Sequence, residues 1–249
     1  MTDCPNTEAA DAYGNAWAAV YDEEHRFLVP GEDQLGVLED LASGRPALEL
    51  GIGTGRVALP LAARGVDLAG VDASPSMVER LRSKEGGTDI QVAIGDMAEV
   101  PVEGRFGLVY VVFNTLFGLP SQAAQVACFK RVAAVLEPGG FFCLECFVPD
   151  LCRFQDGRSL RTVRAGSDDV RIDASVHDPV NQRVASNIVR LASEGTSVRP
   201  VRLRYAWPAE LDLMAQLAGL RLHRRWSDWQ RRPFVAESKS HITIYELPR

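Results

Sequence analysis

The stretch ELGIGTGR, residues 49–56, decides the fold of this chain of 249 residues. Three glycines at alternating positions follow an apolar run that ends at Leu50, and an amphipathic segment begins directly after them. A glycine-rich turn between a strand and a helix lets a ligand approach the main chain closely, because glycine has no side chain. The stretch therefore predicts a ligand site at the end of a strand.

Two common ligands of glycine-rich turns do not fit this one. A phosphate-binding loop of the G-x-x-x-x-G-K-[ST] type needs a lysine, and none follows the turn. A dinucleotide fingerprint needs a third glycine where Arg56 stands, and an arginine there would obstruct both close helix packing and the pyrophosphate. The turn therefore favours neither a phosphate nor NAD or FAD as its ligand. A nicotinamide oxidoreductase is for this reason the weaker interpretation of the chain, and an NADH titration would test it.

The surrounding sequence alternates between strand and helix patterns. The predicted strands are 46–51, 66–74, 89–96, 106–114 and 141–148, and the predicted helices between them are 55–65, 75–86 and 122–140. A helical arm is expected over 8–28 and a further helix over 33–43. Such alternation predicts an α/β fold with a doubly wound, mostly parallel sheet.

The pattern changes after residue 150. Three segments alternate apolar and polar residues and predict an inserted antiparallel β meander: 169–178, 182–192 and 198–207. A helix over 208–219 and two antiparallel strands over 220–226 and 241–247 would complete a seven-stranded sheet. We expect four parts: an N-terminal helical arm or lid (1–45), an α/β core (46–150), a substrate-covering sheet (151–207) and a C-terminal part that completes the core (208–249).

Composition excludes several classes of protein. The net charge of −6 is unfavourable for binding along a nucleic-acid backbone. The longest apolar run, 106–119, is too short to span a bilayer, and no secretory signal precedes the first helix. Cys143 and Cys146 are three residues apart in a predicted strand, so their side chains point to opposite faces and form no metal or redox pair. We expect a cytoplasmic protein with no metal, no membrane contact and no nucleic-acid partner.

Three successive strands end with a carboxylate or carry one close to their end. Glu49 lies two residues before Gly51, Asp72 ends the strand in GVDAS, and Asp96 ends the strand in IGDM. The carboxyl ends of parallel strands meet at one edge of the sheet, where ligands bind in open α/β folds. Asp72 can accept hydrogen bonds from both hydroxyls of a ribose, and Asp96 with the Met97 N–H can bind an adenine. These residues indicate a nucleoside with a charged tail that contains no phosphate.

The combination of LELGIGTGR, GVDASPSM, GDM and LEPGG at these spacings resembles the class I S-adenosylmethionine-dependent methyltransferases, over about residues 46–147. The resemblance implies a Rossmann-like methyltransferase fold and S-adenosylmethionine as the cofactor. It places Gly51, Gly53 and Gly55 against the methionine part, Asp72 on the ribose, Ala73 and Met77 beside the adenosine, and Asp96 with Met97 on the adenine. The further residues expected in the cofactor site are Tyr13, Tyr21, Glu49, Arg56 and Phe113.

The N-terminal arm carries Tyr13, Trp17, Tyr21 and His25 at every fourth position, which would place them on one side of a helix. This stripe is either part of the core or a lid over the cofactor. Tyr21-Asp22 resembles an N-terminal Tyr-Asp of small-molecule N-methyltransferases, those acting on nucleotide-linked aminosugars or glycine. We therefore expect Tyr21 to act in catalysis as a positioning residue, since an aromatic ring attracts a cation such as a sulfonium.

Candidate acceptor-binding residues come from three places. Asn114 and Phe117 match the outer positions of the Asn/Asp-Pro-Pro-aromatic motif of amino-methyltransferases, whereas Thr115 and Leu116 replace its prolines. The segment 221–234 holds five arginines together with Trp226 and Trp229 and is either a solvated face or a rim that attracts an anionic acceptor. The residues expected to bind the acceptor are Asn114, Phe117, Tyr205, Trp226 and Trp229.

These features predict methyl transfer to a small molecule by in-line displacement, with positioning as the main source of rate. N-methylation is favoured over O-methylation. A non-catalytic S-adenosylmethionine-binding partner protein is the alternative from another class. The identity of the acceptor and the formation of a homodimer stay open.

Overall fold

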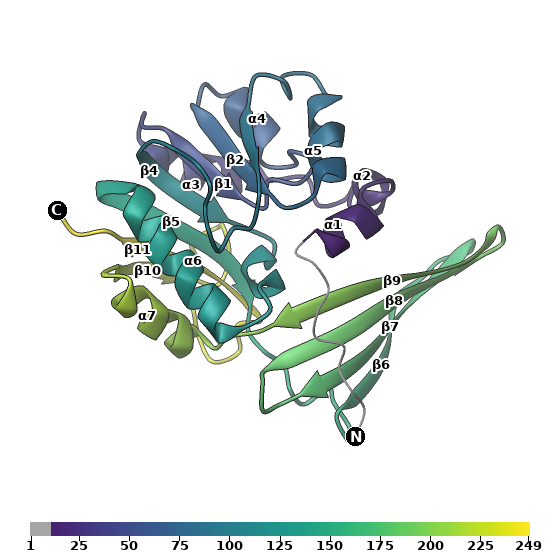
Figure 1. Cartoon of the computed structure of the whole chain (residues 1–249). Helices are drawn as coiled ribbons and strands as arrows, with labels where there is room; N and C mark the ends of the chain where they lie inside the picture. The colour runs from purple at the N-terminus through teal and green to yellow at the C-terminus, as the bar shows by residue number, and fades with distance from the viewer. Residues whose placement is uncertain (1–10) are drawn as a thin grey trace.

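The computed structural model describes residues 11–249 and contains two β-sheets (Figure 1). The larger sheet has seven strands in the order β10-β11-β5-β4-β1-β2-β3. Its strands are β1 (Ala47–Leu50), β2 (Leu68–Asp72), β3 (Gln91–Ile94), β4 (Phe106–Val111), β5 (Leu136–Phe147), β10 (Arg221–Trp226) and β11 (Ser240–Glu246). Strands β1 to β5 pair in parallel, and β11 pairs antiparallel with both β5 and β10. The predicted doubly wound, mostly parallel seven-stranded sheet is confirmed.

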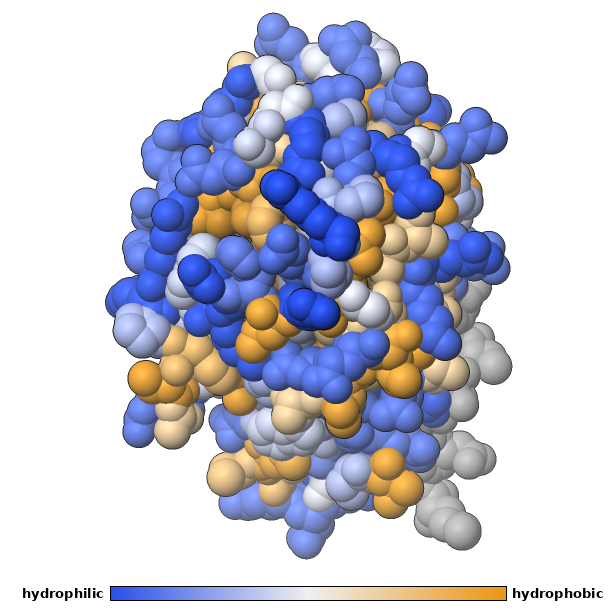
Figure 2. Space-filling model, turned by 90° about the vertical axis from the view of Figure 1, so that its left-hand side faces the viewer, coloured by the Kyte–Doolittle hydropathy of each residue, from blue (hydrophilic) through white to orange (hydrophobic). Residues whose placement is uncertain are grey.

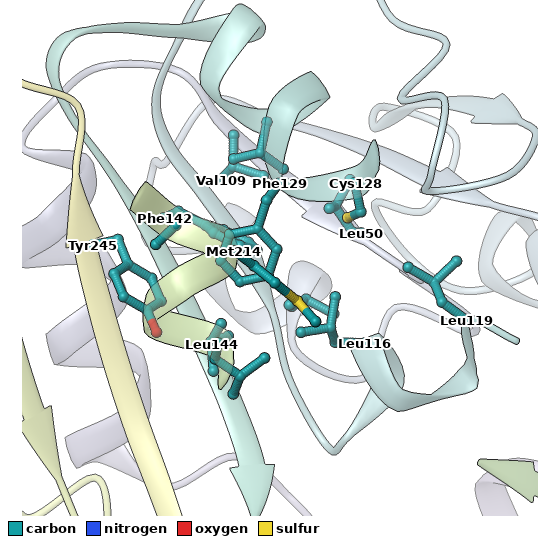
Figure 3. Close-up of a cluster of buried hydrophobic side chains, with 14 of the residues drawn as sticks. Leu50, Val109, Leu116, Leu119, Cys128, Phe129, Phe142, Leu144, Met214 and Tyr245 are labelled. Atoms are coloured by element: carbon teal, nitrogen blue, oxygen red, sulfur yellow. The ribbon is translucent and has the colours of Figure 1, made fainter. Parts of the chain in front are cut away.

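Helices cover both faces of this sheet. On one face lie α6 (Gln122–Val135) and α7 (Pro208–Leu217); on the other lie α3 (Glu32–Ala42), α4 (Ala58–Ala62) and α5 (Pro75–Arg82). Alternate residues of β4 divide between the two cores, because side chains of a strand point alternately up and down. Figure 3 shows Val109 of β4 in the first core, together with Phe129 of α6 and Met214 of α7.

The smaller sheet consists of four antiparallel strands in the order β6-β7-β8-β9. They are β6 (Arg158–Ala165), β7 (Asp169–Asp178), β8 (Arg183–Ala192) and β9 (Gly195–Arg204). The three predicted strands of the meander correspond to β7, β8 and β9, whereas β6 is absent from the prediction. Its apolar residues Leu160 and Val163 are three positions apart, and the register shifts between Thr162 and Arg164, so the strand shows no alternation in sequence.

The N-terminal arm forms two short helices, α1 (Ala12–Trp17) and α2 (Tyr21–Glu24), where one helix over 8–28 was expected. The chain turns between them, with the Val20 N–H donating to the Trp17 carbonyl. The arm lies between α5 and β9, that is, between the α/β core and the smaller sheet (Figure 1). The turn at 18–20 therefore moves Tyr21 and His25 towards the glycine turn. Residues 8–10 of the expected helix lie outside the described residues.

No helix within residues 11–249 combines the length and the apolar character that a membrane span requires. On the face to the left of Figure 1, hydrophobic residues lie in separate patches between hydrophilic ones (Figure 2). Such a mixture is ordinary for the surface of a folded protein.

Candidate active site

A cavity of about 520 Å³ lies where the carboxyl ends of β1, β2, β3 and β4 face the arm and the smaller sheet. The size falls within the range of typical ligand pockets, ~300–1,000 Å³. Its walls come from the glycine turn, the ends of β2, β3 and β4, helices α1 and α2, and strands β8 and β9. The cavity thus lies at the sheet edge where the sequence predicts the ligand site.

Asp72 is the last residue of β2, and the cavity wall includes it. Its Oδ2 accepts the Gly53 N–H at 2.7 Å, and its Oδ1 accepts the Ser74 N–H at 2.8 Å. Burial raises the pKa of this carboxyl, against the effect of the Ser74 and Gly53 N–H groups. The two bonds fix the carboxylate, and each oxygen keeps a lone pair that can accept a hydroxyl from a diol.

The three glycines of the turn have different roles. Gly51 and Gly53 line the cavity, with φ angles of +69° and +56°. A Cβ atom on Gly53 would meet no protein atom closer than the Gly51 carbonyl at 4.0 Å, so the space beside it is open. Gly55 is buried away from the cavity, and a Cβ there would lie 2.9 Å from Leu59 Cγ. Gly55 therefore serves the packing of the turn against α4, whereas the sequence analysis placed it against the cofactor.

The next wall comes from the residues that follow β2 and β3. Ala73, Met77, Asp96 and Met97 all line the cavity. The Asp96 Oδ1 accepts the Ala98 N–H at 2.8 Å, which holds the carboxylate at the end of the turn after β3. The structure thus brings together the residues expected on the adenosine part of the cofactor.

Glu49 lies under the glycine turn, beside a second cavity of about 30 Å³ that Gly51, Gly53 and Arg56 also line. The side chain is almost fully buried, and its Oε2 accepts the Tyr110 hydroxyl at 2.9 Å. Burial raises the pKa of Glu49 to about 8, against the hydrogen bond from Tyr110 and the positive charge of Arg56. A buried carboxyl without a full counter-charge is suited to bind an ammonium group.

The turn after β4 is strained and firmly held. Phe113 and Asn114 have φ angles of +56° and +64°, which side-chain-bearing residues rarely adopt and which cost on the order of 1–3 kcal/mol each. The Phe113 N–H donates to Glu145 Oε2 at 2.9 Å, and the Phe147 N–H donates to Asn114 Oδ1 at 2.6 Å. Trp229 Nε1 also donates to Glu145, at 3.1 Å. Strand β5 thus fixes the turn that presents Phe113 to the cavity.

Four aromatic residues of the arm line the cavity: Tyr13, Trp17, Tyr21 and His25. Although the arm is not one helix, the rings still contact each other, with centroids 5.6 Å apart for Tyr13 and Trp17 and 4.3 Å apart for Tyr21 and His25. The stripe therefore covers the cavity. Its Trp17 is at the same time buried, which is what the core interpretation predicts for that residue.

Polar contacts attach the arm to both halves of the molecule. Thr54 Oγ1 and Lys84 Nζ donate to Asp22 Oδ1 at 2.6 and 2.9 Å, which binds α2 to the glycine turn. Glu24 forms an ion pair with Arg171 of β7, and Trp17 Nε1 donates to the Pro200 carbonyl of β9 at 3.5 Å. The arm thus connects the cofactor end of the cavity to the smaller sheet.

Arginines of the smaller sheet form the opposite wall, and the sequence analysis missed them. Arg183, Arg202 and Arg204 line the cavity beside Ile188. Arg204 is paired with Glu210 at 2.6 Å, whereas Arg183 and Arg202 donate to the main-chain carbonyls of Pro120 and Ser186. In a strand where apolar and polar residues alternate, the sequence alone does not show which face lies against a cavity. The sequence pattern therefore does not distinguish these arginines from solvent-exposed ones.

Several expected acceptor-binding residues lie elsewhere. Phe117 and Tyr205 are fully or almost fully buried in the core of the α6 face, and Trp226 and Trp229 pack against the core of the other face. None of these four is part of the cavity wall formed by the described residues. These four aromatic side chains therefore contribute to the packing of the two cores. Asn114 lines the cavity, but its side-chain oxygen is engaged by Phe147.

The arginines of segment 221–234 do not form a rim of this cavity either. Arg225 pairs with Asp212 at 2.6 Å, Arg231 with Asp40 at 2.8 Å, and Arg232 with Asp228 at 2.5 Å. Carboxylates thus neutralise these three arginines. The interpretation as a solvated face with ion pairs fits the structure, and the interpretation as an anion-attracting rim does not.

Comparison with known proteins gives a consistent result. Residues 47–140 match a family described as a methyltransferase domain. The CcbJ methyltransferase from Streptomyces caelestis is similar over 97% of this chain and 100% of its own, with 38% identity and a TM-score of 0.89. The cypemycin N-terminal methyltransferase from Streptomyces sp is 28% identical over 94% of this chain and 97% of its own.

A more distant structure shares the fold. The amino pentose methyltransferase CalS10 from Micromonospora echinaspora, solved with bound S-adenosylmethionine, has a TM-score of 0.69 at 20% identity, over 92% of this chain and 96% of its own. In the present chain, Asp72, Asp96 and Met97 line the large cavity, and Glu49 lines the small one beside the glycine turn. The chain belongs to the S-adenosylmethionine-dependent methyltransferases.

Proposed function

We propose that this enzyme methylates an amine nitrogen of a small molecule that also carries an anionic group. Two of the similar proteins support nitrogen as the acceptor atom, since one is named an N-terminal methyltransferase and the other an amino pentose methyltransferase. When bound, S-adenosylmethionine supplies an activated methyl group, and the electron pair of its C–S bond stays on sulfur as the acceptor bond forms.

The distribution of charge in the cavity carries the proposal. One end holds the carboxylates Asp72 and Asp96, and the other holds Arg183 and Arg202. Among residues 11–249, neither Arg183 nor Arg202 has a carboxylate within ion-pair distance, whereas Arg204 is paired with Glu210. Guanidinium groups without a counter-charge favour a carboxylate or phosphate on the ligand that occupies their end.

Arg202 is the clearer of the two candidates for this contact. Its Nη1 donates to the Ser186 carbonyl at 2.8 Å, which orients the guanidinium, while its Nε has no hydrogen-bond partner among the described residues. Arg183 lies closer to Asp178, whose pKa it helps to lower, so part of its charge acts there. We therefore assign the acceptor's anionic group to Arg202 first.

Tyr21 is proposed as a positioning residue at the junction of the two ends. It lines both the large and the small cavity, next to Glu49 and Phe113. Burial raises the pKa of the Tyr21 hydroxyl, so the group stays protonated and can donate a hydrogen bond at neutral pH. Tyr21→Phe is expected to lower turnover and to leave cofactor affinity nearly unchanged.

The function is tested with a panel of matched small molecules and S-adenosylmethionine, with products identified by mass spectrometry. The panel contains amines with a carboxylate or phosphate (amino acids, dipeptides, aminosugar phosphates), the same amines without the anion (amino acid amides, aminosugars), and α-hydroxy acids. N-methyl products from the anionic amines, lost or weakened for their neutral counterparts, are expected.

Two other outcomes would contradict parts of the proposal. Methylation of the hydroxy acids alone would show an O-methyltransferase. Equal turnover of anionic and neutral amines, together with an unchanged KM in Arg202→Ala, would exclude the anion contact. Arg232→Ala is the matched control, since Arg232 pairs with Asp228 outside the cavity wall.

A further inference from the structure

His25 belongs to the arm that covers the cavity, and it is one of the residues that line it. It lies directly after α2 and lines the cavity together with Phe113 and Tyr21. The centroid of its ring is 5.6 Å from that of Phe113 and 4.3 Å from that of Tyr21. Residues from the arm and from the turn after β4 thus hold the imidazole beside the part of the cavity that joins its two ends.

The hydrogen bond of His25 determines which ring nitrogen is available. Its Nδ1 lies 2.9 Å from the Tyr21 carbonyl, which can only accept, so Nδ1 carries the proton of the neutral ring. Within residues 11–249, no group hydrogen bonds to Nε2. The lone pair of Nε2 is therefore free for a ligand in the cavity.

The charged groups around His25 keep the ring neutral. Burial lowers the pKa of His25, and Arg56 of the glycine turn and Arg171 of β7 lower it further. The Tyr21 carbonyl and the adjacent Glu24 act in the opposite direction, and Glu24 is itself paired with Arg171. The net effect is to lower the pKa of His25 from its ordinary value, which favours the neutral ring.

The other titratable groups of the cavity wall are unsuited to accept a proton from the acceptor. Burial raises the pKa of both Tyr13 and Tyr21, so both are protonated phenols, and the arginines keep their protons at every physiological pH. Asp72 and Asp96 lie at the cofactor end and already accept main-chain N–H groups. Among the described residues that line the cavity, His25 is thus the group with a basic lone pair that no other residue engages.

We infer that His25 is the general base of the reaction and takes one proton from the acceptor amine on Nε2. This inference rests on the proposed function, because it needs an acceptor nitrogen that carries a transferable proton. The N–H bond of the acceptor ammonium breaks, its electron pair stays on nitrogen, and that pair forms the bond to the methyl carbon. The resulting imidazolium returns the proton to solvent after the product has left.

The test compares wild-type enzyme with His25→Ala and His25→Asn, using the panel amine that the wild type methylates fastest. The alanine variant is expected to lower kcat by ~10²–10⁴-fold, while the affinity for S-adenosylhomocysteine changes by less than about threefold. Added imidazole should restore part of the activity of His25→Ala, because the cavity left by the ring admits it. His25→Asn keeps a donor for the Tyr21 carbonyl and should restore stability without restoring activity.

The dependence on pH separates a base from a structural residue. Wild-type kcat should fall on the acidic side as His25 becomes protonated, and this acidic limb should disappear in both variants. Nitrogen NMR of His25 in the free enzyme gives a readout without acceptor: the proton should lie on Nδ1 at neutral pH. His223→Asn, a change of a histidine in β10 outside the cavity wall, is the matched control and should leave kcat and its pH profile unchanged.

The outcomes distinguish the two proposals. A wild-type enzyme that methylates none of the panel amines would refute the proposed function and this inference with it. A wild-type enzyme that methylates an amine, with His25→Ala retaining kcat within about threefold and the same pH profile, would overturn only the assignment of the base. Loss of activity without rescue by imidazole, together with weakened cofactor binding, would also overturn it and indicate a structural role.

Discussion

Replacing Glu49 by glutamine removes a buried ionisable group without changing the shape of the side chain. In the folded protein, burial raises the pKa of this carboxyl to about 8, although Tyr110 donates a hydrogen bond to it and Arg56 lies nearby. The free enzyme therefore holds Glu49 protonated at neutral pH. The glutamine variant resembles this neutral state at every pH, since its amide oxygen can accept the same hydrogen bond from Tyr110.

The magnitude follows from the difference between the folded and the unfolded chain. An unfolded chain releases the proton of Glu49 near its ordinary pKa of 4.5, whereas the folded protein keeps it until about 8. Because the folded state binds the proton more tightly, the free energy of unfolding falls as pH rises between these two values, by ~1.4 kcal/mol per pH unit. Raising the pH from about 6 to about 9 should therefore lower the free energy of unfolding of the wild type by ~3 kcal/mol through Glu49.

The assay is urea unfolding of the wild type and Glu49→Gln at these two pH values. The free energy of unfolding of the variant minus that of the wild type should be ~3 kcal/mol larger at the higher pH than at the lower pH. All other titrating groups are common to both proteins, so their contributions cancel. The same difference at both pH values would refute the reasoning, because it would mean that Glu49 is already ionised in the folded protein.

Cofactor binding should reverse this effect. An ammonium group of the methionine part beside Glu49 favours the ionised carboxylate, so binding at neutral pH should release a proton from the wild type. Calorimetry in two buffers of different ionisation enthalpy measures this proton. Glu49→Gln should bind more weakly and release none, and an equal release from both proteins would contradict the assignment of Glu49 to the ammonium.

Three further predictions concern the cofactor end. Asp72→Ala should weaken binding of S-adenosylmethionine at least about tenfold, because hydrogen bonds to a charged group contribute ~1.5–3 kcal/mol each; calorimetry that shows an unchanged affinity would exclude the ribose contact. Gly53→Val should fold but fail to bind S-adenosylmethionine, since a φ of +56° is strained for valine and the side chain would enter open cavity space. A folded variant that binds the cofactor normally would contradict this prediction. Asp22→Ala removes the contacts with Thr54 and Lys84 and should therefore speed amide hydrogen exchange over residues 11–28. In the wild type, S-adenosylhomocysteine should slow the exchange of the same residues. Equal exchange rates in all samples would show that the arm is a fixed part of the core.

The parts of the fold that follow a simple periodicity could be predicted from sequence. The alternation of strands and helices defines the large sheet, and the turn at Gly51 and Gly53 with Asp72 and Asp96 defines the cofactor end, because residues at strand ends must converge at one sheet edge. The family resemblance also predicts Gly55 against the cofactor, whereas in the structure Gly55 packs against Leu59.

The acceptor end could not be predicted in the same way. Trp226 and Trp229 look in sequence like residues of a binding rim, but the sheet turns them against a core that the sequence does not show. Arg202 looks like one of many solvated arginines, and only the packing of β9 against the arm brings it to the cavity. Long-range packing between the smaller sheet and the α/β core, rather than any local pattern, determines which side chains meet the acceptor.

The contacts of the arm have a consequence for how the protein is made. Helices α1 and α2 leave the ribosome before the residues they contact: Asn15 pairs with Ser74, Glu24 with Arg171, and Trp17 with Pro200. The last of these partners is separated from Trp17 by 183 positions in the chain. The arm therefore cannot dock while it is being synthesised and has to wait until most of the chain has emerged, so the enzyme acquires the roof of its active site late in folding, after the smaller sheet has formed.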